Sequence, residues 1–309
     1  MKQQTGTQQQ TLYSRRLQES GMTFTLSVVL PVLCAAVLIL IVGESEAREA
    51  DWFLYLSYLL PQLCMAAAVA VYFKRTRQPF LETFRPCKWH YFVIAVLLQF
   101  GLLFSVSELN QLFIGFLQTL GYQVSESSSL PNLDGVMLLP ALLVIALLPA
   151  LVEETVFRGI LVRNLDENGS GLAATLVISG ILFSIIHASP EQTVYQFVCG
   201  VCFALIVVRS KSVLPTMLAH FLNNAVILIL TSQGYETEWT FPSALNIALI
   251  VSSAVCFAGA LGYLIFAGKR GNGKGKERIP KGFWLYACVG ILACVVQWIA
   301  ALIAGVGNV

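Results

Sequence analysis

Charged residues are scarce in this chain of 309 residues: 12% are Asp, Glu, Lys or Arg, whereas 57% are hydrophobic. Soluble domains carry about 25% charged residues. The shortage therefore excludes a soluble globular protein, and the mean hydropathy of +0.74 indicates a chain that crosses a membrane several times. Internal repeats, nucleotide-binding loops and nucleic-acid motifs are also missing, so we do not expect nucleic acid as a partner.

The chain shows no cysteine pattern with clear chemistry, and we expect no cleavable leader. Seven of the eight cysteines lie in apolar segments, where cysteine behaves as a small hydrophobic residue. Cys199 and Cys202 have CxxC spacing, but no His, Lys or second such pair lies close in sequence, which argues against a redox or zinc role. Residues 1–20 are polar and rich in Gln, and no small-residue cleavage site follows the first apolar run. We expect them to form a disordered tail.

Long apolar runs predict nine candidate membrane spans, the third of which is interrupted near its end by Glu108, Asn110 and Gln111. The fold class expected is an all-α polytopic membrane protein, a bundle of about 8–9 transmembrane helices with a four-helix catalytic core. After the tail, we expect an N-terminal transmembrane region of about three helices (21–135), the four-helix core (136–232) and a C-terminal region of two helices (233–309). The nine runs are 22–42, 52–73, 90–117, 136–162, 172–188, 191–208, 213–232, 241–267 and 283–305.

Basic residues alternate from one end of these spans to the other. Seventeen of the 19 Lys and Arg residues lie in the N-terminal segment and in every second loop after it. Because Lys and Arg concentrate in cytoplasmic loops, we expect the N-terminus and the segments 74–88, 209–212 and 268–282 to face the cytoplasm. The basic loop 268–282 could bind anionic lipid, although positive-inside anchoring explains it as well. The expected location is the plasma membrane for a bacterial source and the endoplasmic reticulum for a eukaryotic one.

Three charges stand in the apolar run 136–162: Glu153, Glu154 and Arg158. Each costs about 2.5–3.5 kcal/mol near the centre of a bilayer, so a purely structural helix has no reason to carry them. Glu154 and Arg158 have i, i+4 spacing with the acid first, which predicts an ion pair that orients the helix. Glu153 lies about 100° round the helix, without a partner nearby in sequence. This free carboxylate is the leading candidate for a functional group.

Two further helices carry pairs at i, i+4: Phe183 with His187, and His220 with Asn224. A turn motif at residues 168–171 lies midway between Glu153 and His187, so an antiparallel hairpin would bring these two to similar depth. His220 and Glu153 are each expected about 15 Å from the cytoplasmic end.

This set of side chains suits hydrolysis by water. A desolvated carboxylate with a histidine beside it can activate a water molecule. A second histidine and an amide can donate hydrogen bonds to a developing oxyanion. The same residue types leave a zinc site open as an alternative, with Glu153, His187 and His220 as ligands.

The three motifs resemble those of the CPBP family, the CAAX prenyl endopeptidase and bacteriocin-processing (Abi) proteins. Its pattern of Glu-Glu-x-x-x-Arg, Phe-x-x-x-His and His-x-x-x-Asn or Asp occurs here at 153–158, 183–187 and 220–224. The resemblance implies a glutamate-dependent intramembrane endopeptidase without a cofactor, zinc being the minority view. It implies that Glu153 and His187 hold the attacking water and that His220 and Asn224 form an oxyanion hole. The implied partners are membrane lipid and a peptide or lipidated protein, either a prenylated CAAX protein or a bacteriocin or leader peptide.

Two functions of other kinds compete with this interpretation. A proton-coupled transporter could use the intramembrane Glu and His residues as a relay, although such proteins often contain repeated halves, which this chain lacks. A member that has lost catalysis could serve as a scaffold or resistance factor, against which the intact motifs argue. The sequence leaves the oligomeric state open.

Overall fold

The computed structural model describes residues 2–44, 46–124, 130–235, 241–266 and 277–306, with side chains from residue 8 onward. These residues form an all-helical bundle in which eight helices are long and apolar enough to span a membrane. The predicted class, a polytopic helical membrane protein, is confirmed. The helices outside the central region are α1 (Lys2–Val42), η1 (Glu46–Arg48), α2 (Asp51–Thr76), η2 (Phe80–Phe84), α3 (His90–Gly101), η3 (Leu102–Val106), α4 (Ser107–Thr119), α11 (Ser243–Phe266) and α12 (Lys281–Val306).

The central region is built from four helical rods. The first, residues 135–168, is one continuous helix made of a short 3₁₀ turn followed by α-helical and π-helical pieces, and the other three are single α-helices. The pieces are η4 (Gly135–Met137), α5 (Leu138–Ala141), η5 (Leu142–Leu147), α6 (Leu148–Glu154), η6 (Thr155–Val162), α7 (Arg163–Asn168), α8 (Leu172–Ile185), α9 (Thr193–Ser210) and α10 (Leu214–Ser232).

The predicted span at 172–188 is the helix α8, which is shorter than the other candidates. Its 14 residues extend about 21 Å, less than the hydrocarbon thickness of about 30 Å. Small residues bring it close to α9: a Cβ added at Gly200 would lie 2.7 Å from the Cα of Gly180. The α8 helix is therefore short for a span and closely packed inside the bundle, and the helices long enough to span by themselves number eight in the described ranges.

The N-terminal segment also differs from its prediction. Residues 2–20 are the first half of α1 and not a disordered tail. Leu17 is fully buried, and the carboxylate of Glu19 accepts a 2.7 Å hydrogen bond from Arg75. Gly21 allows α12 to approach, since a Cβ there would lie 2.5 Å from the backbone oxygen of Phe283. These contacts with α2 and α12 are between distant parts of the chain, and composition alone did not reveal them.

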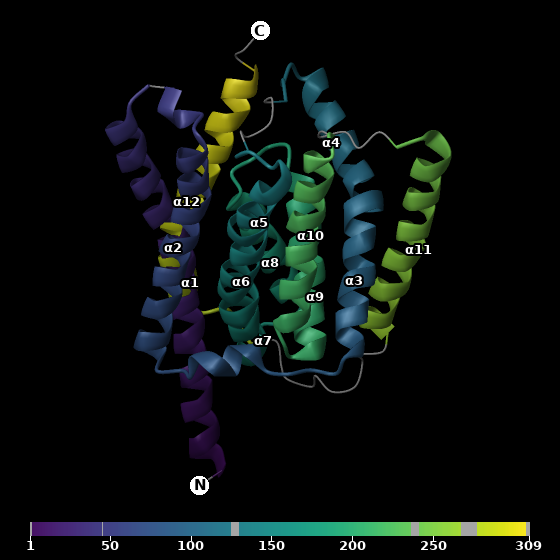
Figure 1. Cartoon of the computed structure of the whole chain (residues 1–309). Helices are drawn as coiled ribbons and strands as arrows, with labels where there is room; N and C mark the ends of the chain where they lie inside the picture. Colours follow the sequence, from purple (N-terminus) through teal and green to yellow (C-terminus); the bar gives the residue numbers. More distant parts are fainter. Residues whose placement is uncertain (1, 45, 125–129, 236–240, 267–276, 307–309) are drawn as a thin grey trace.

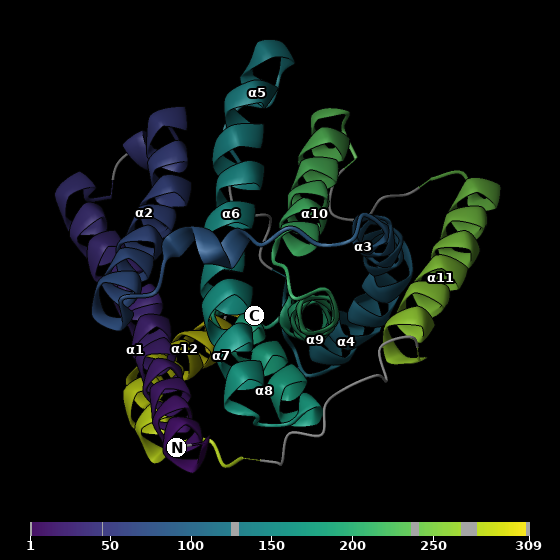
Figure 2. The same cartoon turned by 90° about the horizontal axis from the view of Figure 1, so that it is seen from below.

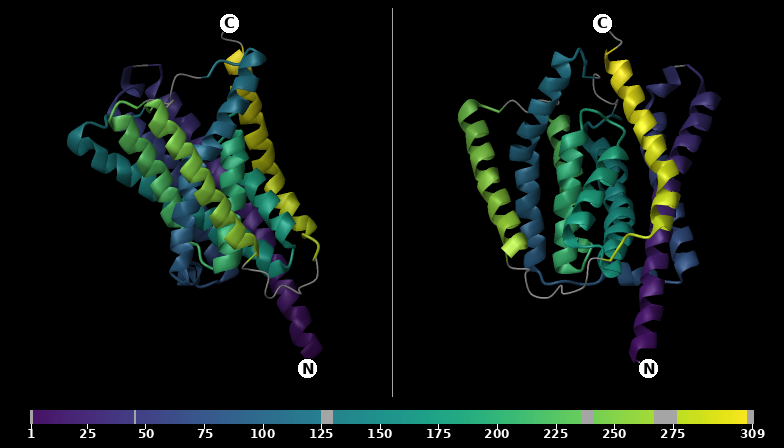
Figure 3. Two further views of the ribbon diagram at one scale, coloured as in Figure 1. Left: turned by 90° about the vertical axis from the view of Figure 1, so that its right-hand side faces the viewer. Right: turned by 180° about the vertical axis from the view of Figure 1, so that it is seen from behind.

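The helix α9 lies at the middle of the bundle (Figure 2), where α8, α10 and the α3–α4 rod pack around it. The last two long helices do not pair with each other. Instead α11 packs against α3 at one edge, and α12 packs against α1 at the other (Figure 1 and Figure 3). The central region is thus enclosed by the first and last parts of the chain.

The predicted alternation of basic loops between the two ends of the spans agrees with the arrangement of the helices. The start of α1, η2 and α7 lie at one end of the bundle, and the end of α12 lies at the other (Figure 1). Most of the basic loop 268–282 lies outside the described residues. The side on which the cytoplasm lies remains a prediction.

Candidate active site

The helix that carries the two acids is irregular where they stand. Glu153 and Glu154 end α6, and π-helical segments adjoin α6 on both sides. Such segments are rare and occur often at functional sites. Pro149 has no N–H to donate to the carbonyl of Ile145, four residues earlier. Nδ2 of Asn224 donates to that carbonyl at 3.2 Å, so α10 is joined to the interrupted helix.

The predicted ion pair is present and completely buried. Nη1 of Arg158 lies 2.9 Å from Oε1 of Glu154, and both side chains have 0% exposure. The guanidinium carbon lies 4.0 Å from the ring centre of Phe183 and 5.1 Å from that of Phe203. Nη2 of Arg158 donates to the backbone oxygen of Cys199 at 3.4 Å. Aromatic faces and a charge-assisted pair together replace the water that the arginine has lost.

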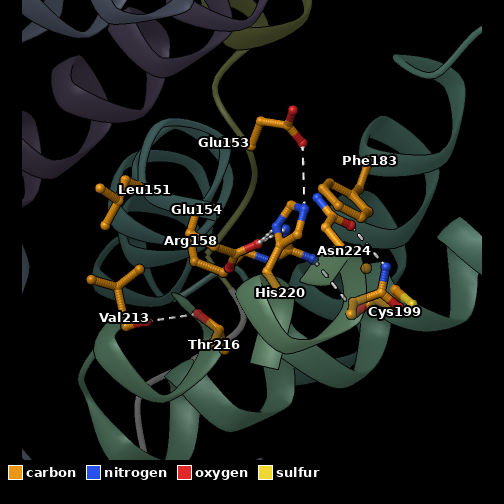
Figure 4. A network of polar contacts seen from close by, with 12 residues as sticks. Leu151, Glu153, Glu154, Arg158, Phe183, Cys199, Val213, Thr216, His220 and Asn224 are labelled. Carbon is orange, nitrogen blue, oxygen red and sulfur yellow. Dashed lines mark hydrogen bonds and ion pairs between the residues drawn. The ribbon is translucent and has the colours of Figure 1, made fainter. Parts of the chain in front are cut away.

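His220 faces both glutamates (Figure 4). Its Nδ1 lies 3.0 Å from Oε1 of Glu154, and its Nε2 lies 4.0 Å from Oε2 of Glu153. Because an ionised carboxylate only accepts hydrogen bonds, we assign the proton of this contact to Nδ1. The oxygen Oε1 of Glu154 therefore accepts from both Arg158 and His220.

Glu153 has a partner that the sequence did not indicate. Nε2 of Gln62, a residue of α2 that is 91 positions away, donates to Oε1 of Glu153 at 2.9 Å. The Glu153 side chain is 13% exposed, whereas that of Glu154 is 0% exposed. The two acids are thus unequal, as predicted, but the less enclosed one is held by a neutral amide from another helix.

His187 lies in the turn that follows α8, beside Phe183. Its Nδ1 is 2.7 Å from the backbone oxygen of Phe183, and the two rings meet edge to face with centres 5.0 Å apart. The next residue, Ala188, has φ of 49°, a conformation that is rare for residues other than glycine. In the described part of the chain, no hydrogen bond or ion pair joins His187 to Glu153. Of the two histidines of the motifs, His220 is the one that contacts the acids.

A chain of side-chain amides orients Asn224. Its Oδ1 accepts from Nδ2 of Asn223 at 2.9 Å, and Oδ1 of Asn223 accepts from Gln99 at 2.8 Å and from the Tyr195 hydroxyl at 2.6 Å. The oxygen and nitrogen of the Asn224 amide are thereby distinguished, and the nitrogen faces η5. Sequence analysis missed Asn223, Gln99 and Tyr195; a polar Gln99 within an apolar run was the signal available.

The residues proposed as alternative zinc ligands are not assembled as a coordination sphere. Among the described residues, no three His, Cys, Asp or Glu side chains lie together as a metal site requires. Nδ1 of His187 is turned to a backbone carbonyl and Nδ1 of His220 to Glu154.

The fold and these contacts define a polytopic membrane protein with a charged and hydrogen-bonded cluster buried among its central helices. Residues 135–226, which include all three motifs, match the family model of the Type II CAAX prenyl endopeptidase Rce1-like proteins. The predicted resemblance is confirmed for this segment, which matches the Rce1-like family model.

One curated relative supports the same assignment. The Bacillus subtilis (strain 168) protein named "Putative membrane peptidase YdiL" is 27% identical over 99 residues. The aligned part is 32% of this chain and 40% of the relative, so the chain matches less than half of that protein's length. No solved structure matches the chain.

Proposed function

We propose that this protein is an intramembrane endopeptidase that hydrolyses a peptide bond of a membrane-associated substrate. The observation that carries the proposal is the unequal environment of two adjacent carboxylates within an Rce1-like segment. Glu154 is paired with Arg158 and completely buried, whereas Glu153 accepts a hydrogen bond from the neutral amide of Gln62 and retains some exposure. A carboxylate without a paired cation, next to a histidine, is suited to take a proton from water.

In the proposed reaction Glu153 accepts a proton from water while the water oxygen bonds to the substrate carbonyl carbon. The carbonyl oxygen becomes an oxyanion, the C–N bond then breaks, and the proton held by Glu153 passes to the departing amine. His187 helps to hold the water, as the family resemblance implies. His220 and Asn224 donate hydrogen bonds to the oxyanion, which is usually the largest contribution to such catalysis.

The contact between His220 and Glu154 sets a condition on this role. Since Nδ1 donates to Glu154, Nε2 can donate to an oxyanion only when the ring carries two protons. The proposed contact of His220 with the oxyanion is therefore made through Nε2, the nitrogen that faces Glu153.

For the substrate we propose a prenylated protein with a C-terminal CAAX sequence, because the matching family model is that of CAAX prenyl endopeptidases. The name of the relative supports peptide hydrolysis at a membrane without specifying a substrate. The direct test is to incubate the purified protein in detergent with a farnesylated CAAX peptide and, separately, with a leader peptide. We expect cleavage of the farnesylated peptide, strongly reduced in Glu153→Gln and unchanged by a strong chelator.

Three results would contradict parts of this proposal. Cleavage of the leader peptide alone would retain the endopeptidase and reject the substrate class. Loss of activity in chelator, restored by zinc, would reject the metal-free mechanism. Failure to cleave either peptide, together with proton-coupled uptake into vesicles, would reject the endopeptidase in favour of a carrier, which is the competing function.

A further inference from the structure

Gln62 is a buried polar side chain in α2, outside the segment that matches the family model. It is 6% exposed, and its Nε2 donates to Oε1 of Glu153 at 2.9 Å. A glutamine that is removed from water needs a hydrogen-bond partner in the protein. The partner here is the carboxylate that acts as the base in the proposed function.

The hydrogen bond leaves the two oxygens of Glu153 in different situations. Oε1 accepts from Gln62, and Oε2 faces Nε2 of His220 at 4.0 Å. The nitrogen end of the glutamine must face the carboxylate, because a carboxylate oxygen can only accept. We propose that Gln62 is a positioning residue that holds Oε1, so that Oε2 is the oxygen that takes the proton from water. The proposal rests on the proposed endopeptidase function.

The chemical type of the donor fits this role. A cation next to a carboxylate favours its ionised form, which is the arrangement of Arg158 and Glu154. A neutral amide fixes the direction of Glu153 without adding a positive charge. The two adjacent acids therefore receive different partners from different helices, one for structure and one for proton transfer.

The orientation of the Gln62 amide depends on this single contact. Oε1 of Gln62 is buried and has no hydrogen-bond partner in the described part of the chain, so Glu153 is the only group that orients the amide. The helix α2 packs against α6, which places Gln62 beside the acid pair. It follows that the Rce1-like segment is completed by a side chain from the N-terminal region.

The decisive variant is Gln62→Met, which keeps the length of the side chain and removes the donor. We expect kcat on the cleaved peptide to fall by about 10- to 100-fold, because a carboxylate that is no longer held loses its alignment with the substrate. KM should stay within about twofold, since Gln62 does not hold the substrate. In a Glu153→Gln background, Gln62→Met should cause no further loss, because the two residues act as one unit.

The chain offers a matched control in Gln297 of α12. Its Nε2 donates to the backbone oxygen of Ala293 in the same helix at 3.2 Å, away from the acids. Gln297→Met should retain the normal kcat. The proposal is wrong if Gln62→Met keeps kcat within twofold of the unsubstituted protein, if it lowers the rate further in the Glu153→Gln background, or if the control loses as much activity.

A readout without catalysis separates this proposal from the proposed function. The infrared carboxylate band of Glu153 can be assigned by subtracting the spectrum of Glu153→Gln. We expect it to shift in Gln62→Met and not in Gln297→Met, even if neither peptide is cleaved. An unshifted band in Gln62→Met would overturn the proposal whatever the activity.

Discussion

Nδ1 of His220 lies 3.0 Å from the same oxygen of Glu154 that accepts from Arg158. This shared oxygen connects the predicted ion pair of one helix to the histidine of another. Arg158 and Glu154 are therefore part of the framework that orients His220 and not an isolated packing pair. Several consequences can be measured.

Arg158→Ala should reduce the yield of folded protein as well as activity. The substitution leaves Glu154 buried without its cation, which typically costs about 3–5 kcal/mol. Thermal unfolding in detergent measures the loss. Arg85→Ala is a suitable control, because Arg85 pairs with Glu82 at the surface and exposed pairs contribute about 1 kcal/mol or less. An Arg158→Ala protein as stable as the control but inactive would mean that Arg158 acts on the substrate.

Asn224→Ala should lower kcat by about 10²–10³-fold, the usual loss for one oxyanion donor, with a smaller effect on KM. Kinetics on the cleaved peptide measure the change. Asn246→Ala in α11, far from the motifs in sequence, should have no such effect. Equal activity of the two variants would remove Asn224 from the proposed oxyanion hole.

Tyr195→Phe should weaken catalysis by less than Asn224→Ala does. The change removes the 2.6 Å hydrogen bond to Asn223 but leaves the bond from Gln99, so the amide of Asn224 is less firmly oriented. We expect a fall in kcat of about 3- to 10-fold, within the range of one net hydrogen bond. A Tyr195→Phe variant that is more impaired than Asn224→Ala would assign the hydroxyl a direct role.

The topology can be tested by labelling single cysteines in intact cells and inverted vesicles, after replacement of the exposed Cys288. Lys211→Cys, 57% exposed at the basic end of the bundle, should react only from the cytoplasmic side. Glu46→Cys, in the loop between α1 and α2, should react only from the other side. The reverse pattern would invert the predicted orientation.

The parts of the site that lie close in sequence could be predicted, and the contacts between distant helices could not. The ion pair of Glu154 and Arg158 follows from i, i+4 spacing, which is local. The contact of Gln62 with Glu153 joins residues 91 positions apart, and a single glutamine in an apolar run does not specify its partner. The hydrogen bond between Asn223 and Gln99 is of the same kind.

The same division between features that are local in sequence and contacts between distant segments applies to the fold. Hydropathy located eight spanning helices, because a bilayer fixes the length of an apolar run. It marked a ninth run at α8, whose 14-residue helix is shorter than the other candidates and packs closely against α9. It also missed the helix over residues 2–20, whose order depends on contacts of Leu17 and Glu19 with distant segments.

The most direct test of the account is the rate of peptide cleavage by Glu153→Gln. Glutamine keeps the shape of the side chain but cannot take a proton, so kcat should fall by at least the 10²–10⁴ typical of a lost general base. The protein should remain folded, because a neutral amide costs less to bury than a carboxylate. Near-normal cleavage by a folded Glu153→Gln protein would contradict the account, since every mechanism considered for this site needs that carboxylate.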